Sequence, residues 1–497
     1  MSVLSLVGQA WAAGLQQDEQ EQRELPAVQQ KAAVQFTLNR VIFPDSAFLS
    51  PAELDAVASV YVGKVVSFND ITKLVEKINQ LYTQKNITTA LAVLSNQKII
   101  DGQIHIDLVE AKLGQVTVNA NYTDTDFIRR QLHLETDQTL DLRRTDEEIT
   151  RFNRIFDVQI AAQVSPGAAP GLTDLVIDTR ESDPYQIKVF ADNQSAPSLG
   201  RDEVGINASA AGLIGNADLL AVMLGKSAGA LNGSVTYGIG VGQDDAQVNT
   251  SLSRNNISII SGTAKVIDIK GVTDRAALGW NQPYLATQEW LLASDFTYAR
   301  AISTNTSANE LISKFDINTF STDITVSQRG DGMQWFGQLE VDYGQSLSLT
   351  DQHNDYFVFS GNMNGNIFLT DTIYMALRSN GQFTKKTALP PSALLQIGGE
   401  ETVRGYDTGF ATGTDGFVLS AELHDNLGDG WDAQVFVDHG QVGSDGAPKV
   451  KITGTGLGVS RTWNNIVAKI SYGHADNIVR AEQSHDRLDA RIEVRFF

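Results

Sequence analysis

Strict alternation of apolar and polar residues dominates the C-terminal part of the chain. The last segment is the clearest case, with apolar residues at every second position from Leu488 to Phe496 and charged residues between them. Near Trp335 the pattern recurs, with Trp335, Gly337, Leu339, Val341 and Tyr343 on one face and Gln334, Gln338, Glu340 and Asp342 on the other. One apolar and one charged face, repeated over many long strands, is what a barrel with a lipid-facing outside and a wet lumen requires. Backbone groups in lipid are satisfied only if such a barrel closes.

The alternation extends from about residue 184 to the end of the chain, which predicts an all-β transmembrane barrel over 184–497. We expect about 16 antiparallel strands, a number within the even-numbered range of bacterial barrels. The apolar face would then contact the lipids of an outer membrane. A large soluble β-sandwich or propeller is the alternative fold, but its strands are shorter and its turns recur roughly every 8–12 residues.

Between about residues 34 and 183 the pattern is α+β, and it occurs twice with a period of roughly 75 residues. Each copy has the order strand, helix, helix, strand, strand. In the first copy, residues 34–111, Ser50 caps a helix with Pro51 at its first position and Glu53 three residues after the cap, a capping-box arrangement. The second copy spans residues 112–183.

The second helix of the first copy has a clear apolar face. Its residues recur at helical spacing and are Ile71, Leu74, Val75, Ile78 and Leu81. The second copy has helical patterns over DTDFIRRQLHL and RRTDEEITRFNRIF, followed by strands over VQIAAQVSPG and TDLVIDTRE.

The first 33 residues allow more than one interpretation. Residues 1–15 are moderately apolar and end in small residues, like a signal-peptide remnant, although no basic residue precedes them. A poorly ordered terminus is the alternative. Residues 16–33 are polar and rich in Gln and Glu, which fits either a helix or a linker, and Pro26 interrupts their end.

Composition excludes several classes of protein. The net charge of -21 argues against a nucleic-acid partner, because binding phosphates needs a basic face. The absence of cysteine excludes disulfide stapling, thiol catalysis and cysteine metal sites. No run of about 18 uninterrupted apolar residues occurs, so the sequence predicts no transmembrane helix.

The longest stretch without alternation runs from about Thr387 to Asp415. A loop of this length in a compact domain is usually functional. It contains the tetrapeptide VRGY, formed by Val403, Arg404, Gly405 and Tyr406. Its glycines, including Gly398 and Gly399, allow backbone angles that other residues resist. From the residues alone, a solvated surface position remains open for the arginine.

Several long segments of the chain resemble one family, the two-partner secretion transporters of the haemolysin secretion/activation type, which combine POTRA modules with a β-barrel. The stretch beginning LSPAELDAVASVYVGKVVSFND is similar to their first POTRA module, and VSPGAAPGLTDLVIDTRES resembles the end of their second. FADNQSAPSLGRDEVGINASAAGLIGNADLLAV is similar to their first barrel hairpin. GGEETVRGYDTGFATGTDGFVLSAEL carries the VRGY signature. The resemblance covers about Val34 to Phe497.

This resemblance implies that the VRGY loop folds back into the barrel, where Arg404 pairs with an aspartate on the inner wall. The matching position is Asp438, in AQVFVDHGQV. Alternation agrees, because Ala433, Val435 and Val437 form the apolar face and leave Asp438 on the lumen face. An arginine fork donates two parallel hydrogen bonds to a carboxylate, which lysine cannot do. The supporting positions of this site are Gly398, Gly399, Phe436 and Gly440.

The resemblance further implies an outer-membrane pore with its POTRA modules in the periplasm. These modules would recognise an unfolded exoprotein of the adhesin, haemolysin or contact-dependent toxin class, which the barrel then secretes. Residues 16–33 would be the candidate plug helix. Phe496 and Phe497 resemble the terminal signal that the barrel-assembly machinery reads during biogenesis. The alternative function is an outer-membrane barrel-assembly or insertion factor, which shares the VRGY loop but usually carries more POTRA modules.

The sequence indicates no enzyme, cofactor or metal site. GIGVG, residues 238–242, superficially resembles a nucleotide loop, but no helix follows it, so we interpret it as part of a barrel strand. His485, Asp486 and Asp489 match no metal-ligand spacing. His439 adjoins Asp438, but alternation places its side chain on the opposite face, and no nucleophile–base–orienter set is visible.

Overall fold

The computed structural model describes residues 35–349, 352–386, 388–444, 448–481 and 483–496. The predicted signal-peptide remnant, 1–15, and the predicted helix or linker, 16–33, lie outside the described residues. The chain divides into two compact units, and the second comprises Glu181–Phe497 together with 121–127 and 150–158. None of the described helices is long and apolar enough to cross a membrane.

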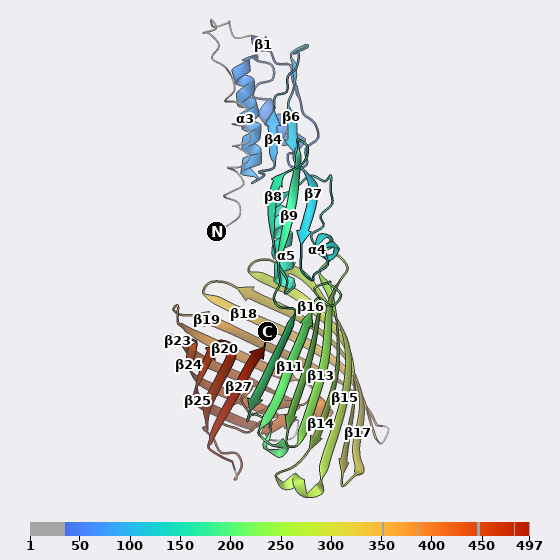
Figure 1. Ribbon diagram of the computed structural model, residues 1–497, viewed down its shortest axis with the longest axis vertical. Coiled ribbons are helices and arrows are strands. Elements are labelled where there is room, and N and C mark those ends of the chain that lie inside the picture. Colours follow the sequence, from blue (N-terminus) through green and yellow to red (C-terminus); the bar gives the residue numbers. More distant parts are fainter. Residues whose placement is uncertain (1–34, 350–351, 387, 445–447, 482, 497) are drawn as a thin grey trace. The chain divides into compact units, whose positions relative to one another are not determined.

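The first α+β copy contains short strands around two helices (Figure 1). Its elements are, in order, β1 (Gln35–Thr37), β2 (Arg40–Ile42), α2 (Pro51–Ala58), β3 (Val65–Ser67), α3 (Phe68–Gln84), β4 (Ala90–Val93), β5 (Gln103–His105) and β6 (Asp107–Glu110). β1 pairs with β3, β2 runs parallel to β5, and β4 pairs with β6. The strand predicted from FTLNRVIF is thus two strands, separated at Leu38, which is fully buried.

The predicted capping box is present at the start of α2. The Glu53 backbone N–H donates to Ser50 Oγ at 3.4 Å, and the Ser50 backbone N–H donates to the Glu53 carboxylate at 2.8 Å. The hydrogen bond from the Ser50 backbone, together with bonds from Lys85 and the Ser50 hydroxyl, lowers the pKa of Glu53 to about 2. The predicted apolar face of α3 lies in the core, where Ile71, Leu74, Ile78 and Tyr82 are buried.

The second α+β copy has the predicted order of strand, helix, helix, strand, strand. Its elements are β7 (Lys112–Asn119), α4 (Thr125–Gln131), α5 (Leu142–Ile155), β8 (Gln159–Pro166) and β9 (Leu172–Arg180). They include a three-stranded sheet of order β7-β9-β8, in which β7 and β9 are parallel and β8 and β9 are antiparallel.

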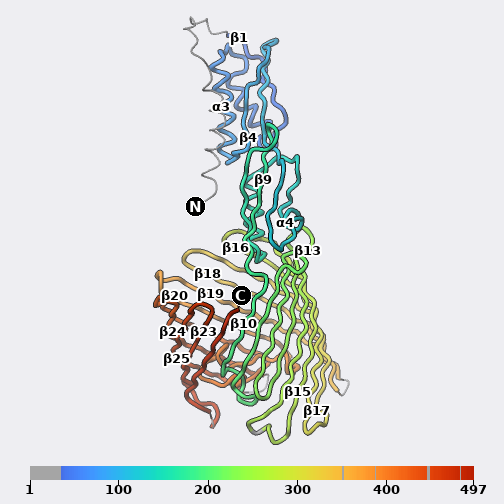
Figure 2. The backbone as a smooth tube through the Cα atoms, viewed as in Figure 1, coloured from blue at the N-terminus to red at the C-terminus, as the bar shows by residue number. Residues whose placement is uncertain are grey.

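The rest of the chain is a closed antiparallel barrel of 16 strands, which confirms the predicted fold and strand number. Figure 2 follows the backbone through consecutive hairpins to β27, which pairs with β10 and closes the sheet. The strands are β10 (Tyr185–Asp192), β11 (Glu203–Ala211), β12 (Leu219–Ser227), β13 (Ala230–Val241), β14 (Ala246–Ser258), β15 (Ile269–Ala286), β16 (Trp290–Ser307), β17 (Glu310–Arg329), β18 (Met333–Ser348), β19 (His353–Phe368), β20 (Ile373–Phe383), β23 (Asp415–Gly428), β24 (Trp431–Gly443), β25 (Val450–Trp463), β26 (Ile466–Ala475) and β27 (Asp486–Phe496). The short 3-10 turns η1 (Pro197–Leu199) and η2 (Thr263–Ile267) lie between barrel strands.

The outside of the barrel is apolar, as the alternation predicted. Leu339 on β18 is 73% exposed although it is a large apolar side chain, and Leu488 on β27 is 57% exposed. An outward aromatic row crosses β16 to β19, with ring centroids 5.0, 6.5 and 5.0 Å apart in the series Tyr298, Phe320, Tyr343 and Phe357. Exposed apolar and aromatic side chains on every second residue are typical of a lipid-facing surface.

The two ends of the barrel differ in their connections. At the proximal end, where β10 begins and β27 ends, the turns are short, for example 429–430 and 464–465. At the distal end several connections are long, including 193–202 and 476–485. The longest, 384–414, joins β20 to β23 and is called the lumen loop below. It corresponds to the long stretch without alternation.

Candidate functional site

The lumen loop is an ordered element that packs against the barrel wall. After the turn η3 (Pro391–Ala393), β21 (Leu395–Ile397) pairs with β22 (Ala411–Gly413). Apolar residues of the loop and of β23 to β26 form one buried cluster, composed of Ile397, Val403, Tyr406, Phe410, Ala411, Val418, Val442, Ile452 and Ala475. Burial of this apolar surface favours the seated loop.

Arg404 and Asp438 meet at the centre of this contact. The Arg404 side chain is 1% exposed and that of Asp438 is 0% exposed. Nε of Arg404 donates to Oδ2 at 2.7 Å, and Nη2 donates to Oδ1 at 2.8 Å. The Arg404 backbone N–H also donates to Oδ2, at 3.0 Å. The structure therefore brings the loop arginine and the wall aspartate together in the two-pronged geometry that only arginine provides.

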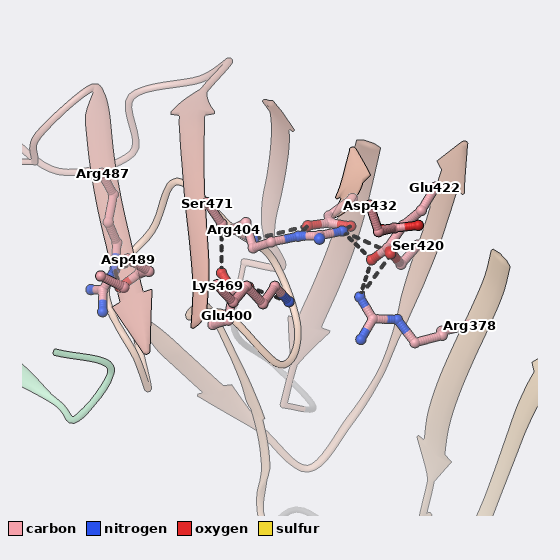
Figure 3. Close-up of polar contacts among 12 residues, drawn as sticks. Arg378, Glu400, Arg404, Ser420, Glu422, Asp432, Lys469, Ser471, Arg487 and Asp489 are labelled. Atoms are coloured by element: carbon pink, nitrogen blue, oxygen red, sulfur yellow. Dashed lines mark hydrogen bonds and ion pairs between the residues drawn. The ribbon is translucent and has the colours of Figure 1, made fainter. Parts of the chain in front are cut away.

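A second carboxylate and an aromatic ring complete the surroundings of Arg404. Its Nη2 lies 2.7 Å from Oε1 of Glu422 and donates to Ser420 Oγ at 3.3 Å. Its Cζ lies 3.4 Å from the ring centroid of Phe436, a cation–π contact. Figure 3 shows the Arg404 side chain pointing toward Ser420 and Glu422 on the wall. The cation thus lies among groups that favour its charged form.

Glu422 connects Arg404 to further charged residues on the wall. It forms an ion pair with Arg378 of β20, which reaches it from a neighbouring strand (Figure 3). Nε2 of His424 lies 2.8 Å from Oε2 of Glu422, and Nδ1 lies 2.8 Å from Oδ1 of Asp432. Hydrogen bonds in such a chain strengthen one another where water is excluded. The network runs from the loop to Asp432, near the proximal turn of β24.

Glycines let the loop turn and approach the wall closely. Gly398 and Gly399 both have φ +103°, and Gly405 has φ +89°, a region that disfavours residues with a Cβ. On the wall, a Cβ at Gly440 would lie 2.8 Å from Cγ2 of Val403, and a Cβ at Gly454 would lie 1.9 Å from the carbonyl oxygen of Arg404. The Val403 side chain therefore packs directly on Gly440 of β24, and the Arg404 backbone lies directly on Gly454 of β25.

Two more loop residues hold the loop to the wall. The Tyr406 ring is 1% exposed, and its hydroxyl lies 2.9 Å from the Thr453 carbonyl oxygen and 2.8 Å from Oδ1 of Asn477. Glu400 accepts a hydrogen bond from Ser471 at 2.8 Å and lies 2.9 Å from Nζ of Lys469, both on β26 (Figure 3). The loop is thus attached to several neighbouring strands.

Sequence reasoning included the wall glycine Gly440 but missed Glu422 and the wall glycines of β25. The sequence nevertheless contains a pattern that marks each of them. Ser420, Glu422 and His424 are polar at every second position of β23, which marks the lumen face. TGTGLG in β25 places glycines at alternate positions, and their Cβ-free surface faces the side chains of β24 and the loop. Alternation gave the face of each residue but not which side chains meet across strands.

The other candidate groups make contacts of their own and do not touch Arg404. GIGVG lies in β13 and its proximal turn, as predicted. His439 contacts Thr453 Oγ1 at 2.8 Å, and Asp489 pairs with Arg487. Among the residues that the structure describes, no group of three or more His, Cys, Asp and Glu side chains is arranged to hold a metal ion.

Two protein-family models match the sequence of this chain. The sequence model of the haemolysin secretion/activation protein ShlB/FhaC/HecB matches residues 171–461, and that of the POTRA domain, ShlB-type, matches residues 36–111. The heme/hemopexin transporter protein HuxB of Haemophilus influenzae is 23% identical over 393 residues, which cover 75% of this chain and 68% of HuxB.

Two solved structures show the same fold. CdiB from Escherichia coli aligns with a TM-score of 0.69 and 18% identity over 100% of both chains. BamA from Haemophilus ducreyi, in a structure lacking POTRA domains 1–3, aligns with a TM-score of 0.56 and 13% identity over 93% of this chain and 100% of that chain. At these identities the likeness concerns the fold alone.

Proposed function

The chain belongs to the haemolysin secretion/activation protein family ShlB/FhaC/HecB, and from this premise we propose how its parts act in secretion. Members of this family are outer-membrane two-partner secretion pores for exoproteins, and their POTRA domains lie in the periplasm. The prediction of a secretion pore is thereby confirmed, and the alternative of a barrel-assembly factor is less supported, because the BamA likeness is one of fold.

We propose that residues 34–111 and 112–183 are two POTRA modules and that 184–497 is the barrel. The repeated order of elements and the POTRA match over 36–111 support these boundaries. The second module offers an edge for capture, since β8 (Gln159–Pro166) ends the sheet β7-β9-β8. An unfolded segment that pairs with an edge strand gains backbone hydrogen bonds, while neighbouring side chains set its register.

The exoprotein that we propose as partner is large and belongs to the adhesin, haemolysin or contact-dependent toxin class. Outer-membrane lipids would contact the exposed apolar band, and the barrel-assembly machinery would insert the chain during biogenesis. This family is one of secretion proteins rather than enzymes, and the proposed function includes no catalytic step, cofactor or metal.

The buried Arg404–Asp438 pair carries the proposed role of the lumen loop. We assign to Arg404 the task of holding the VRGY segment, residues 403–406, against β24 and β25 in the position that secretion requires. Removal of one member of a buried ion pair leaves the other charge without compensation, which costs about 3–5 kcal/mol. Here Arg404 loss would expose two carboxylates, Asp438 and Glu422, to each other across the vacated space.

Secretion by a heterologous Gram-negative host tests the proposal. The full chain with a signal peptide is co-expressed with the exoprotein encoded beside it, and exoprotein is measured in the medium and in the periplasm. We expect wild-type release, a strong loss in Arg404→Ala and a clear loss in Arg404→Lys. Arg300→Lys is the matched control, because Arg300 forms a two-pronged pair with Asp316 away from the loop. Full secretion by Arg404→Lys would contradict the proposed role.

A further inference from the structure

The barrel closes through a short seam between its first and last strands. Residues Ile187–Asp192 of β10 pair with Arg491–Phe496 of β27, which is the shortest ladder in the barrel. Beyond it, Asn193 extends the contact: its Nδ2 donates to the Leu488 carbonyl at 3.0 Å, and its Oδ1 accepts from the Ala490 N–H at 2.8 Å. The Asn193 backbone N–H also donates to the Ala490 carbonyl oxygen at 3.3 Å, so this one residue makes three hydrogen bonds to β27 beyond the ladder.

The lumen loop binds this distal part of β27 through the residue that follows VRGY. Nη1 of Arg487 lies 2.7 Å from Oδ1 of Asp407, and its Nε donates to both oxygens of Asp489 at 2.9 and 2.8 Å. The side chains of Arg487 and Asp489 are 3% and 2% exposed. Arg201, from the connection after β10, approaches Asp489 to 3.6 Å. Figure 3 shows Arg487 and Asp489 on a strand separate from the Arg404 site.

The next loop residue binds the other side of the seam. The hydroxyl of Thr408 donates to the carbonyl oxygen of Gln194 at 2.7 Å. Gln194 lies in the connection 193–202, directly after β10. Adjacent residues of the loop, Asp407 and Thr408, therefore contact the last strand and the first hairpin at the same time. These contacts are independent of Asp438, which lies on β24.

We propose that Asp407, Thr408 and Arg487 form a latch that fastens the lumen loop across the distal seam. When the loop leaves its position on the wall, the latch opens and β10 can separate from β27. The inference rests on the proposed function, in which the loop must lie against the wall for secretion. It adds that the loop in this position also stabilises the closed barrel. The physical basis is the shortness of the seam ladder, where few backbone hydrogen bonds and the Arg491–Asp192 ion pair join β10 to β27 directly. The loop adds contacts on both sides of this seam, to β27 through Asp407–Arg487 and to the connection after β10 through Thr408–Gln194, so it opposes local opening. Arg487 and Asp407 are positioning residues in this role.

Amide hydrogen exchange of the purified full chain in lipid nanodiscs measures seam opening directly. Asp407→Asn keeps the size of the side chain and removes its charge, so we expect exchange about tenfold faster in 187–192 and 491–496 than in the wild type. Exchange in β16 to β18 is expected to stay unchanged. Asp316→Asn is the matched control, because it breaks another Arg–Asp pair of the same barrel, on its lipid-facing side. Unchanged seam exchange in Asp407→Asn, or an equal change in the control, would overturn the latch.

A second variant and a second readout keep the test decisive. Thr408→Val removes only the hydroxyl that binds Gln194, and we expect a smaller acceleration, about threefold, confined to the first hairpin. If Asp407→Asn does not fold into a barrel that shifts in gel mobility on heating, the result for Thr408→Val alone decides whether the latch exists. Secretion is scored in parallel. Faster seam exchange with normal secretion supports the latch and leaves the proposed role of Arg404 standing, because Arg404 keeps its pair with Asp438 in both variants. Unchanged seam exchange with lost secretion overturns the latch and leaves the proposed function standing.

Discussion

The lumen wall has two regions that follow the same strand pattern and differ in what covers them. On β23 to β27 the loop covers inward residues that include buried charged side chains, and Asp438, Arg487 and Asp489 are 0%, 4% and 2% exposed. On β14 the inward residues are neutral, polar and partly or fully exposed, namely Asn249, Ser251, Ser253 and Asn255. Both regions belong to one closed sheet.

This difference shows what the loop adds to the wall that it covers, namely partners for buried charged side chains. Removing a partner from a buried charge is costly, so the wall residues Asp438 and Glu422 depend on the loop arginine that pairs with them. Neutral polar groups that keep contact with solvent need no such partner. Changes to the charged wall should therefore displace the loop, while equal changes to the neutral wall should leave it seated.

The largest expected effect comes from Asp438→Ala. It leaves Arg404 buried without its two-pronged partner, at a cost to loop seating of about 3–5 kcal/mol. Amide exchange of residues 395–413 is the measurement, and it should approach that of an exposed loop. Ser253→Ala on the neutral wall is the control, with an expected change within about 0.5 kcal/mol. Protection of the loop in Asp438→Ala equal to that in the control would break the comparison.

A methyl group on the charged wall should have the next largest effect. In Gly454→Ala the new Cβ would lie 1.9 Å from the Arg404 carbonyl oxygen, so the loop or β25 must shift. Overpacking of this kind costs about 1–3 kcal/mol. Gly279→Ala on β15 is the matched substitution, because its nearest neighbour is the Thr297 hydroxyl at 3.1 Å. We expect faster loop exchange only in Gly454→Ala. Equal loop exchange in Gly454→Ala and Gly279→Ala would show that the close approach of the loop to Gly454 does not hold the loop in place.

Glu422→Gln should have the smallest effect of the three. The amide keeps the shape of the side chain, and Arg404 retains both oxygens of Asp438, so we expect a loss of about 1 kcal/mol in loop seating. Exchange of 395–413 again reports the change. A loss as large as that in Asp438→Ala would mean that the two carboxylates act as one unit, which would revise the assignment of Asp438 as the main partner.

Much of the fold was predictable because it depends on local pattern. Alternation gave a closed barrel of 16 strands, and the capping box at Ser50 gave the start of α2. The lumen face of Asp438 followed from the same alternation. Glu422 and the contact of Asp407 with Arg487 were not predictable, since they depend on which residues are opposed across strands. The pairing of Ser420 with Asp438, and of Asp438 with Gly454, is a property of register that no single strand contains.

The central claim is that Arg404 acts by seating the loop, and a covalent tether tests it most directly. A Cβ at Gly440 would lie 2.8 Å from Cγ2 of Val403, so Val403→Cys with Gly440→Cys places two thiols within disulfide reach in a chain that has no cysteine. The measurement is secretion by Arg404→Ala carrying this pair, with each single cysteine in the same background as control. Our account predicts that secretion returns when the disulfide forms and stays lost in the single-cysteine variants. A tethered loop that still fails to support secretion would contradict it, because Arg404 would then serve a purpose other than position.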